Sequence, residues 1–156
     1  MNDIQRTFIG AAAAEASKAS HPFPLMAACE AALESNYGLS ELAREGNNLF
    51  GMKQHKHPAF GTLSLPTREF VNAEWIATTA EWVKYPDWLS CFADRLATLQ
   101  RLASVYPHYA AALAAGDAES YIAQVSLTWS TDPNRGAKVL SIYQEFSGGT
   151  NASKTS

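Results

Sequence analysis

The sequence predicts a mainly helical α+β domain in which one small β-hairpin stands beside a body of helices. Three observations lead to this prediction. Apolar residues recur at helical spacing in both halves of the chain, whereas the stretch between them, residues 46–85, loses that spacing and is rich in Gly, Pro, Asn and Thr. Short extended segments that contain Thr, Val, Ile and aromatic residues lie inside the same stretch.

The composition is that of one folded domain. The chain has 156 residues, of which 47% are hydrophobic and 17% charged, so it is long enough and apolar enough to bury a sizeable core. We find no internal repeat and no second domain. The expected division is a globular domain over residues 1–147 and a disordered polar tail over residues 148–156.

The first half of the chain should hold three helices. Apolar residues at helical spacing begin at Ile4 and mark the first helix, with Asp3 as a candidate cap. The proline-rich stretch 21–24 ends it. Residues 25–34 form the second helix, which is apolar nearly all round and therefore belongs in the core. A short third helix is expected over residues 41–44.

The middle of the chain should form a hairpin and long loops. Residues 62–65, 68–71 and 75–79 are extended candidates, and Asn72-Ala73 can turn one strand into the next. Loops as long as those in this region are usually functional in a compact domain.

The second half returns to helical periodicity. The strongest apolar stripe covers residues 88–102, and shorter helices are expected over residues 107–115 and 118–129. A last helix should begin with Pro133 in its first turn and end near Phe146.

Charge and hydropathy argue against two classes of partner. The formal net charge is −3 and the isoelectric point is near 5.8, so no basic stripe is available to bind nucleic acid. No apolar run has membrane-spanning length and no signal peptide opens the chain, so we expect synthesis in the cytoplasm without a leader and no membrane insertion. Cys29 and Cys91 lie in apolar patterns and are predicted to be buried side chains rather than a disulfide or a nucleophile.

Residues 31–40 hold the first candidate for chemistry. An alanine-rich run ends in Glu34, and polar and turn-forming residues follow at once. Burial and the negative end of a helix both favour the protonated form of a carboxyl group, which is the form that a general acid needs. Glu34 is therefore a candidate general acid. The ordinary alternative is a glutamate that leaves its helix into water.

A catalytic role for Glu34 calls for a second polar group across a groove. The middle region offers Glu69, Glu74 and Glu81, and strand alternation places Glu69 and Val71 on one face. Two carboxylates that face each other from distant parts of a sequence fit glycoside hydrolysis. Three solvated acids on a polar ribbon are the alternative.

Aromatic and histidine side chains surround these acids. Tyr37, Phe60 and Trp75 are candidate walls of a groove, because aromatic faces stack on sugar rings. His55 and His57 could bind a metal, but no third and fourth ligands stand at helpful spacing, so a solvated loop is favoured. We expect neither a metal nor another cofactor.

Five segments in order resemble a known family. They are residues 32–40, residues 47–53, residues 66–72, residues 82–85 with Asp94 in the following helix, and residues 129–133. Over roughly residues 4–146 they resemble glycoside hydrolase family 73, the β-N-acetylglucosaminidases with a lysozyme-like fold. That family includes the hydrolase domain of the flagellar rod-cap protein and those of many autolysins.

The resemblance implies a lysozyme-like helical domain whose β-hairpin lobe forms one side of a substrate groove. It implies that Glu34 is the general acid and Glu69 the base or stabiliser, and that the bond cleaved is the β-1,4 bond between N-acetylglucosamine and N-acetylmuramic acid in the glycan strand of peptidoglycan. Whether the mechanism is inverting, retaining or assisted by the substrate's N-acetyl group stays open. The expected substrate-binding residues are Tyr37, Asn48, Phe50, Trp129 and Asp132.

The chain departs from the family pattern at two positions. Trp129 stands where the family usually has a tyrosine that is thought to assist catalysis, and Arg135 replaces a second common tyrosine. Either Tyr121 supplies a phenol nearby, or activity is low. A glycan-binding module that has lost its activity is therefore one alternative, and a lytic transglycosylase is another.

The biological setting follows from the same resemblance. A wall hydrolase without a leader or wall-anchoring repeats suggests an antibacterial effector exported whole, for example by a type VI secretion system, into the periplasm of a rival cell. Such a toxin implies a periplasmic immunity protein that binds it. A phage endolysin is the alternative.

Overall fold

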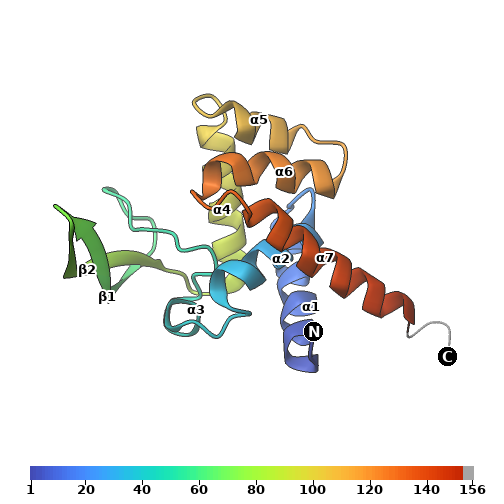
Figure 1. The fold of residues 1–156 in the computed structure, drawn as a ribbon, viewed down its shortest axis with the longest axis horizontal. Helices are drawn as coiled ribbons and strands as arrows, with labels where there is room; N and C mark the ends of the chain where they lie inside the picture. Colours follow the sequence, from blue (N-terminus) through green and yellow to red (C-terminus); the bar gives the residue numbers. More distant parts are fainter. Residues whose placement is uncertain (153–156) are drawn as a thin grey trace.

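The computed structural model describes the backbone of residues 1–152 and the side chains of residues 1–149. In this part of the chain the elements are α1 (Asp3–Lys18), α2 (Pro24–Ser35), α3 (Glu41–Gly46), β1 (Gly61–Val71), β2 (Glu74–Lys84), α4 (Trp88–Leu102), α5 (Pro107–Leu113), α6 (Ala118–Trp129) and α7 (Arg135–Ala152). The helices gather into one body, and the two strands form a hairpin that projects from it (Figure 1). The predicted mainly helical α+β class is confirmed.

Helix α2 runs through the middle of the helical body (Figure 1). Every residue of the stretch Met26–Ala32 is at most 1% exposed, as its apolar composition predicts. Helix α1 packs against it with Ala12 and Ala16 fully buried. One residue of α2 breaks the pattern, because Glu30 is a carboxylate with no exposed surface.

The helix ends differ in two places from the sequence-based expectation. Asn2, not Asp3, caps α1: its side chain accepts from the Gln5 amide, and the Gln5 side chain accepts from the Asn2 amide, each at 2.9 Å. Helix α7 continues to Ala152 instead of ending near residue 146. The rest of the expected tail, residues 153–156, lies outside the described residues.

Contacts with the first helix accompany the longer α7. Arg6 of α1 donates hydrogen bonds to the backbone carbonyls of Glu145 and Phe146, so the two helices meet where the sequence pattern predicted a free end. None of the helices in the described part of the chain is long and apolar enough to span a membrane.

The hairpin is regular and longer than the sequence indicates. Strands β1 and β2 pair antiparallel from Gly61 opposite Lys84 to Val71 opposite Glu74. Its turn is the predicted Asn72-Ala73, with positive φ angles of 50° and 64°. The strands extend beyond the predicted segments because cross-strand hydrogen bonds hold the additional residues in an extended conformation. Residue preferences alone do not reveal this pairing.

Only the base of the hairpin is packed against the body. Val83 near the base is 1% exposed, and Lys53 adds one bridge to Trp82. At the tip, by contrast, the Phe70 and Trp75 side chains are 61% and 65% exposed. The hairpin is therefore anchored at one end and free over most of its length.

Candidate active site

A groove of about 810 Å³ opens where the end of α2 faces the base of β2 and the end of α6. Its described lining residues are Glu34, Phe50, Gly51, Met52, Lys53, His55, Trp82, Tyr109, Trp129, Ser130 and Thr131. Glu34 is the one carboxylate among them. Aromatic rings and a few polar groups around a hollow of this size are typical of a small-ligand or glycan site.

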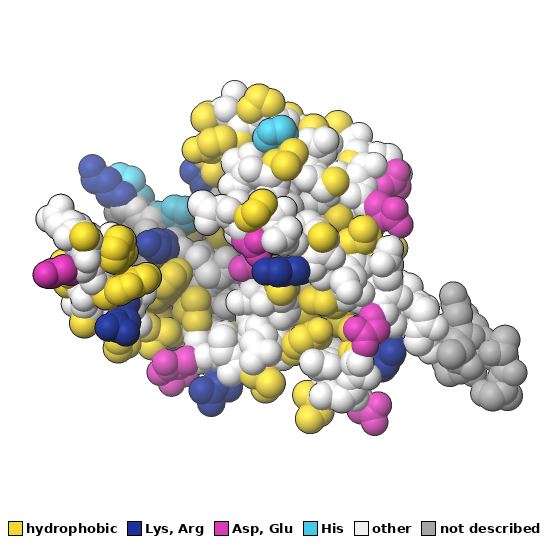
Figure 2. Space-filling model, viewed as in Figure 1, with side chains coloured by type: hydrophobic (Ala, Val, Ile, Leu, Met, Phe, Trp, Pro, Cys, Tyr) yellow, Lys and Arg dark blue, Asp and Glu magenta, His cyan; other side chains and the backbone are white. Residues whose placement is uncertain are grey.

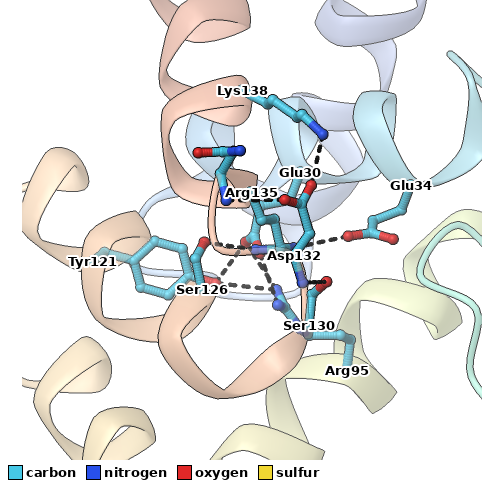
Figure 3. A network of polar contacts seen from close by, with 10 residues as sticks. Glu30, Glu34, Arg95, Tyr121, Ser126, Ser130, Asp132, Arg135 and Lys138 are labelled. Atoms are coloured by element: carbon cyan, nitrogen blue, oxygen red, sulfur yellow. Dashed lines mark hydrogen bonds and ion pairs between the residues drawn. The ribbon is translucent and has the colours of Figure 1, made fainter.

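Glu34 lies in the last turn of α2, and its side chain is 27% exposed. Its side chain is thus partly covered at the groove, while the residue as a whole is exposed. Its Oε1 atom accepts a hydrogen bond of 2.8 Å from Nε of Arg135, which begins α7 (Figure 3). This bond fixes the orientation of the carboxylate. No local sequence pattern indicates it, because the two residues are 101 positions apart.

Arg135 belongs to a buried charge network that continues beneath the groove (Figure 3). Its Nη2 donates to Oε2 of Glu30 at 2.8 Å, while its Nη1 donates to Oγ of Ser126 at 2.9 Å. Arg95 of α4 donates two hydrogen bonds, of 2.9 and 2.8 Å, to the same Glu30 carboxylate. Two arginines thus balance the two carboxylates Glu30 and Glu34.

The environment of Glu30 explains how a carboxylate survives in the core. Burial opposes its ionisation, but Arg95 and Arg135 outweigh that effect and lower the pKa of Glu30. Tyr121 adds a hydrogen bond of 2.7 Å to Oε1 of Glu30. Burial also raises the pKa of Tyr121, so its hydroxyl remains a donor. Tyr121 serves this network and does not reach the groove in place of the missing tyrosine.

Trp129 contacts both the buried charge network and the groove. The Arg95 guanidinium lies between two rings, 4.3 Å from the ring centre of Trp129 and 4.6 Å from that of Phe50. Both rings also line the groove. A large indole is therefore what separates the buried charge network from the substrate side. A phenol does reach the groove from another helix, since Tyr109 of α5 lines it.

Three of the expected substrate-binding residues do not line the groove, and Tyr37 and Asn48 are two of them. Tyr37 packs edge-on against Phe8, with ring centres 6.3 Å apart. Asn48 is 1% exposed, and its side-chain amide is fully hydrogen-bonded to backbone groups. Its nitrogen donates to the carbonyls of Met52 and Val83, and its oxygen accepts from the backbone amide of Met52, each at 2.9 Å. Asn48 thus holds the loop before the hairpin against β2.

Asp132 is also placed differently from the expectation. Its carboxylate accepts from Nζ of Lys138 at 2.6 Å and from the Asn134 amide at 2.9 Å, and these two bonds lower its pKa. It faces a neighbouring hollow of about 660 Å³ rather than the groove. Its part in the site is to order the loop in which Ser130 and Thr131 line the groove.

The structure does not bring Glu69 to Glu34. Glu69 lies opposite Ile76 on the hairpin face that also carries Leu63 and the groove-lining Trp82. It stands six residues beyond Leu63 along β1, about 20 Å at roughly 3.3 Å per residue. Glu69 therefore shares a strand face with a groove-lining residue but lies far out on the projecting lobe.

Phe60 and Trp75 lie away from the groove, whereas His55 lines it. Phe60 packs on Tyr85 with ring centres 5.1 Å apart, and Trp75 contacts Phe70 at the hairpin tip at 5.3 Å. Among the described residues, no third side chain joins His55 and His57 to form a group that could hold a metal.

Sequence comparison places the chain among enzymes that cleave glycans. The profile of the glucosaminidase family, described as mannosyl-glycoprotein endo-beta-N-acetylglucosaminidase, matches residues 10–148. A probable N-acetylmuramidase of Lactococcus lactis is 31% identical over 145 residues, which cover 88% of this chain and 32% of that protein. The peptidoglycan hydrolase FlgJ of Salmonella typhimurium is 31% identical over 122 residues, which cover 75% of this chain and 37% of that protein. The chain thus spans about a third of the length of these relatives.

Solved structures agree with this placement. The glycoside hydrolase domain of Salmonella typhimurium FlgJ superposes with a TM-score of 0.76 at 26% identity, covering 99% of this chain and 95% of that one. The catalytic domain of the autolysin Auto from Listeria monocytogenes has a TM-score of 0.78 at 24% identity, covering 94% and 86% of the two chains. The fold implied by the sequence motifs is therefore confirmed.

Proposed function

Because the chain belongs to the glucosaminidase family of glycoside hydrolases, we propose that it hydrolyses the β-1,4 bond between N-acetylglucosamine and N-acetylmuramic acid in peptidoglycan, with Glu34 as general acid. The observation that carries this proposal is the position of Glu34. Among the described residues that line the groove it is the one carboxylate, and a buried arginine holds one of its two oxygens.

The proposed chemistry follows from that geometry. A glycan strand lies along the groove between the Trp82 and Trp129 walls. Oε1 of Glu34 accepts from Arg135, which keeps the carboxyl group from rotating away, so the proton to be transferred is carried on Oε2. Glu34 gives this proton to the glycosidic oxygen as the bond to the anomeric carbon breaks, and a water molecule adds to that carbon. Glu69 is the proposed second carboxylate, which reaches the substrate when the hairpin swings toward the groove.

A Glu34→Gln variant tests the acid. The amide keeps the shape of the side chain but has no acidic proton, so hydrolysis of purified peptidoglycan should fall by a factor of about 10² to 10⁴. Glu41→Gln, which removes an exposed carboxylate at the start of α3, is the matched control and should retain full activity. Unchanged hydrolysis by the Glu34 variant, or loss of hydrolysis by the control, would contradict the assignment.

Product analysis tests which bond is cleaved. The names of the relatives point to different bonds, since the family is called a glucosaminidase and the Lactococcus lactis protein a probable N-acetylmuramidase. New reducing ends on N-acetylglucosamine support the proposal. Reducing ends on N-acetylmuramic acid would reassign the bond, and anhydro-muramic ends would make the protein a lytic transglycosylase. Wall binding with no new ends at all would make it a binding module.

The proposed setting is that of an antibacterial effector that acts in the periplasm or on the wall of a target cell, with a periplasmic immunity protein as its inhibitor. The groove is open to solvent along its length in Figure 2, between the hairpin and the helical body, so a small protein could occupy it. Expression directed to the periplasm should lyse a host cell, whereas cytoplasmic expression should not. A neighbouring gene whose product abolishes this lysis supports the effector; a neighbouring holin gene supports the phage endolysin instead.

A further inference from the structure

A second hollow adjoins the groove on the far side of His55. It has a volume of about 440 Å³ and lies between the loop before the hairpin and helix α4. Its described lining residues are His55, Lys56, His57, Asp94, Ala97, Thr98 and Arg101. His55 lines both hollows, so a ligand can extend from the groove into this second space.

The basic side chains of this hollow have no partners within the described part of the chain. No ion pair, ring contact or hydrogen bond made by the side chain itself is found there for His55, Lys56, His57 or Arg101. Arg44, Arg68 and Lys84 are also unpaired among the described residues, but they line neither this hollow nor the groove. Figure 2 shows Lys, Arg and His side chains gathered beside the gap between the hairpin and the helices. For a chain with a net charge of −3, this is a local excess of positive charge.

The one carboxylate of the hollow is already engaged. Asp94 accepts a hydrogen bond from the hydroxyl of Tyr85. Burial and this bond raise the pKa of Tyr85, so the phenol remains the donor. One oxygen of Asp94 is therefore engaged by Tyr85. Among the described residues, neither Lys56 on the loop nor Arg101, which lies on the same helix α4 as Asp94, forms an ion pair with it, so both remain available to a ligand.

The loop that carries three of these side chains is fixed at its base. The Gln54 backbone amide donates to the carbonyl of Glu81 at 2.9 Å, which ties the loop to β2. The Gln54 side chain donates to the carbonyls of Phe60 and Gly61 and to Oγ1 of Thr62, at 3.2, 2.9 and 2.8 Å, and so closes the loop on itself. Residues 55–57 are thus presented on a closed loop, which lowers the entropy that binding would cost.

We propose that this hollow binds the carboxylates of the peptide stem carried by N-acetylmuramic acid. The inference rests on the proposed function, which places a glycan strand in the adjoining groove. In intact peptidoglycan the sugars themselves carry no charge, because the lactyl carboxyl group of N-acetylmuramic acid is bound in the amide link to the peptide. The peptides attached along the strand carry free carboxylates, which are the partners that Lys56 and Arg101 lack. The hollow therefore selects glycan whose peptides carry free carboxylates.

The test compares two substrates and two double variants. Lys56→Ala/Arg101→Ala removes the two positive charges of the hollow. Arg44→Ala/Lys84→Ala removes two exposed positive charges that line neither this hollow nor the groove. On intact peptidoglycan, kcat/KM of the first variant should fall about tenfold, equivalent to about 1.4 kcal/mol. On peptidoglycan whose free carboxylates have been converted to amides with carbodiimide and ammonia it should equal that of the unmodified protein. The control pair should match the unmodified protein on both substrates.

Two results would overturn the proposal. One is an equal loss on both substrates, which would mean that the cations hold the strand or another anion of the wall. The other is no loss on intact peptidoglycan. Melting temperatures of both variants establish that they are folded, and a Lys56→Glu/Arg101→Glu variant should show a larger loss on intact peptidoglycan alone.

A binding measurement separates this proposal from the proposed function. With Glu34→Gln, a disaccharide that carries a tetrapeptide should bind about tenfold more tightly than the same disaccharide whose tetrapeptide carboxylates have been converted to amides, and the Lys56→Ala/Arg101→Ala change should remove the difference. If the unmodified protein cleaves neither peptidoglycan preparation, the proposed hydrolysis fails while this difference still reports on the hollow. Equal affinity for the two disaccharides rejects the peptide site even if hydrolysis is observed.

Discussion

Arg135 links the catalytic candidate to the core of the protein. Its guanidinium spans Glu30, which is wholly buried, and Glu34, which is 27% exposed at the groove. Because one rigid fork contacts both carboxylates, the position of Glu34 depends on a charge network that the substrate never touches. The residue is in this sense a positioning residue, and its effect on the reaction is expected to act through Glu34.

An Arg135→Leu variant should be strongly destabilised. It leaves Glu30 with Arg95 alone and removes the partner of Glu34, and breaking a buried ion pair of this kind costs about 3 kcal/mol or more. The free energy of unfolding in urea measures this cost. Lys138→Ala, which breaks the exposed pair with Asp132, serves as the control and should change the free energy of unfolding by about 1 kcal/mol at most. Equal effects of the two changes would refute the account.

The residue scale also shows what sequence reasoning can and cannot find. Glu34, Phe50 and Trp129 were located from motifs, and the structure places all three at the groove. Arg135 was seen only as a departure from a family pattern, because its partner Glu34 lies 101 residues away along the chain. A signal was nevertheless present: Glu30 interrupts an apolar helix, and Arg95 lies within the stripe of another, which together indicate a buried pair.

At the scale of elements, the hairpin decides how the proposed second carboxylate works. Helix positions were predicted well because turn and cap residues mark their ends, whereas strand lengths were underestimated because pairing partners are tertiary. Strand alternation in the sequence predicts that Glu69 and Val71 share one face, but the projection of the hairpin away from the helices depends on packing at its base. The separation of Glu69 from Glu34 was therefore not predictable from the motif.

A Glu69→Gln variant tests whether the hairpin delivers this carboxylate. If the lobe closes on the bound strand, kcat on peptidoglycan should fall by about 10² or more while the melting temperature is unchanged. Glu74→Gln, at the exposed hairpin end next to the turn, is the matched control and should leave kcat unaltered. Full activity of the Glu69 variant would instead assign the second role to the N-acetyl group of the substrate.

At the scale of the whole molecule, the buried network makes stability depend on pH. Burial lowers the pKa of His21 to about 4, an effect that the nearby Glu30 only partly offsets. Its Nδ1 accepts from the Phe23 amide at 3.0 Å, so the neutral ring carries its proton on Nε2, which faces the Tyr121 hydroxyl at 3.3 Å. Below the ordinary histidine pKa of 6.5 the ring is protonated in the unfolded chain, while in the folded chain it stays neutral down to about pH 4.

The free energy of unfolding should therefore decrease as the pH falls from 6.5 to 4, by about 3 kcal/mol in all. Glu30 acts in the same direction at lower pH, because its lowered pKa contributes stability above about pH 4.5 that is lost on protonation. Urea unfolding at pH 7 and at pH 5 measures the first effect. A His21→Asn variant, which has no titrating ring, should show a flatter pH dependence over this range; an unchanged slope would show that other groups cause it.

The two free cysteines have a consequence for where the protein can work. Cys29 and Cys91 are both fully buried, and burial raises the pKa of each thiol to about 12. At neutral pH almost none of either thiol is the reactive thiolate, and no surface reagent reaches it. The protein therefore folds without forming a disulfide, and its cysteines are not accessible to an oxidant. A chain built in this way keeps the same covalent state in the reducing interior of a cell and in the oxidising space outside its inner membrane.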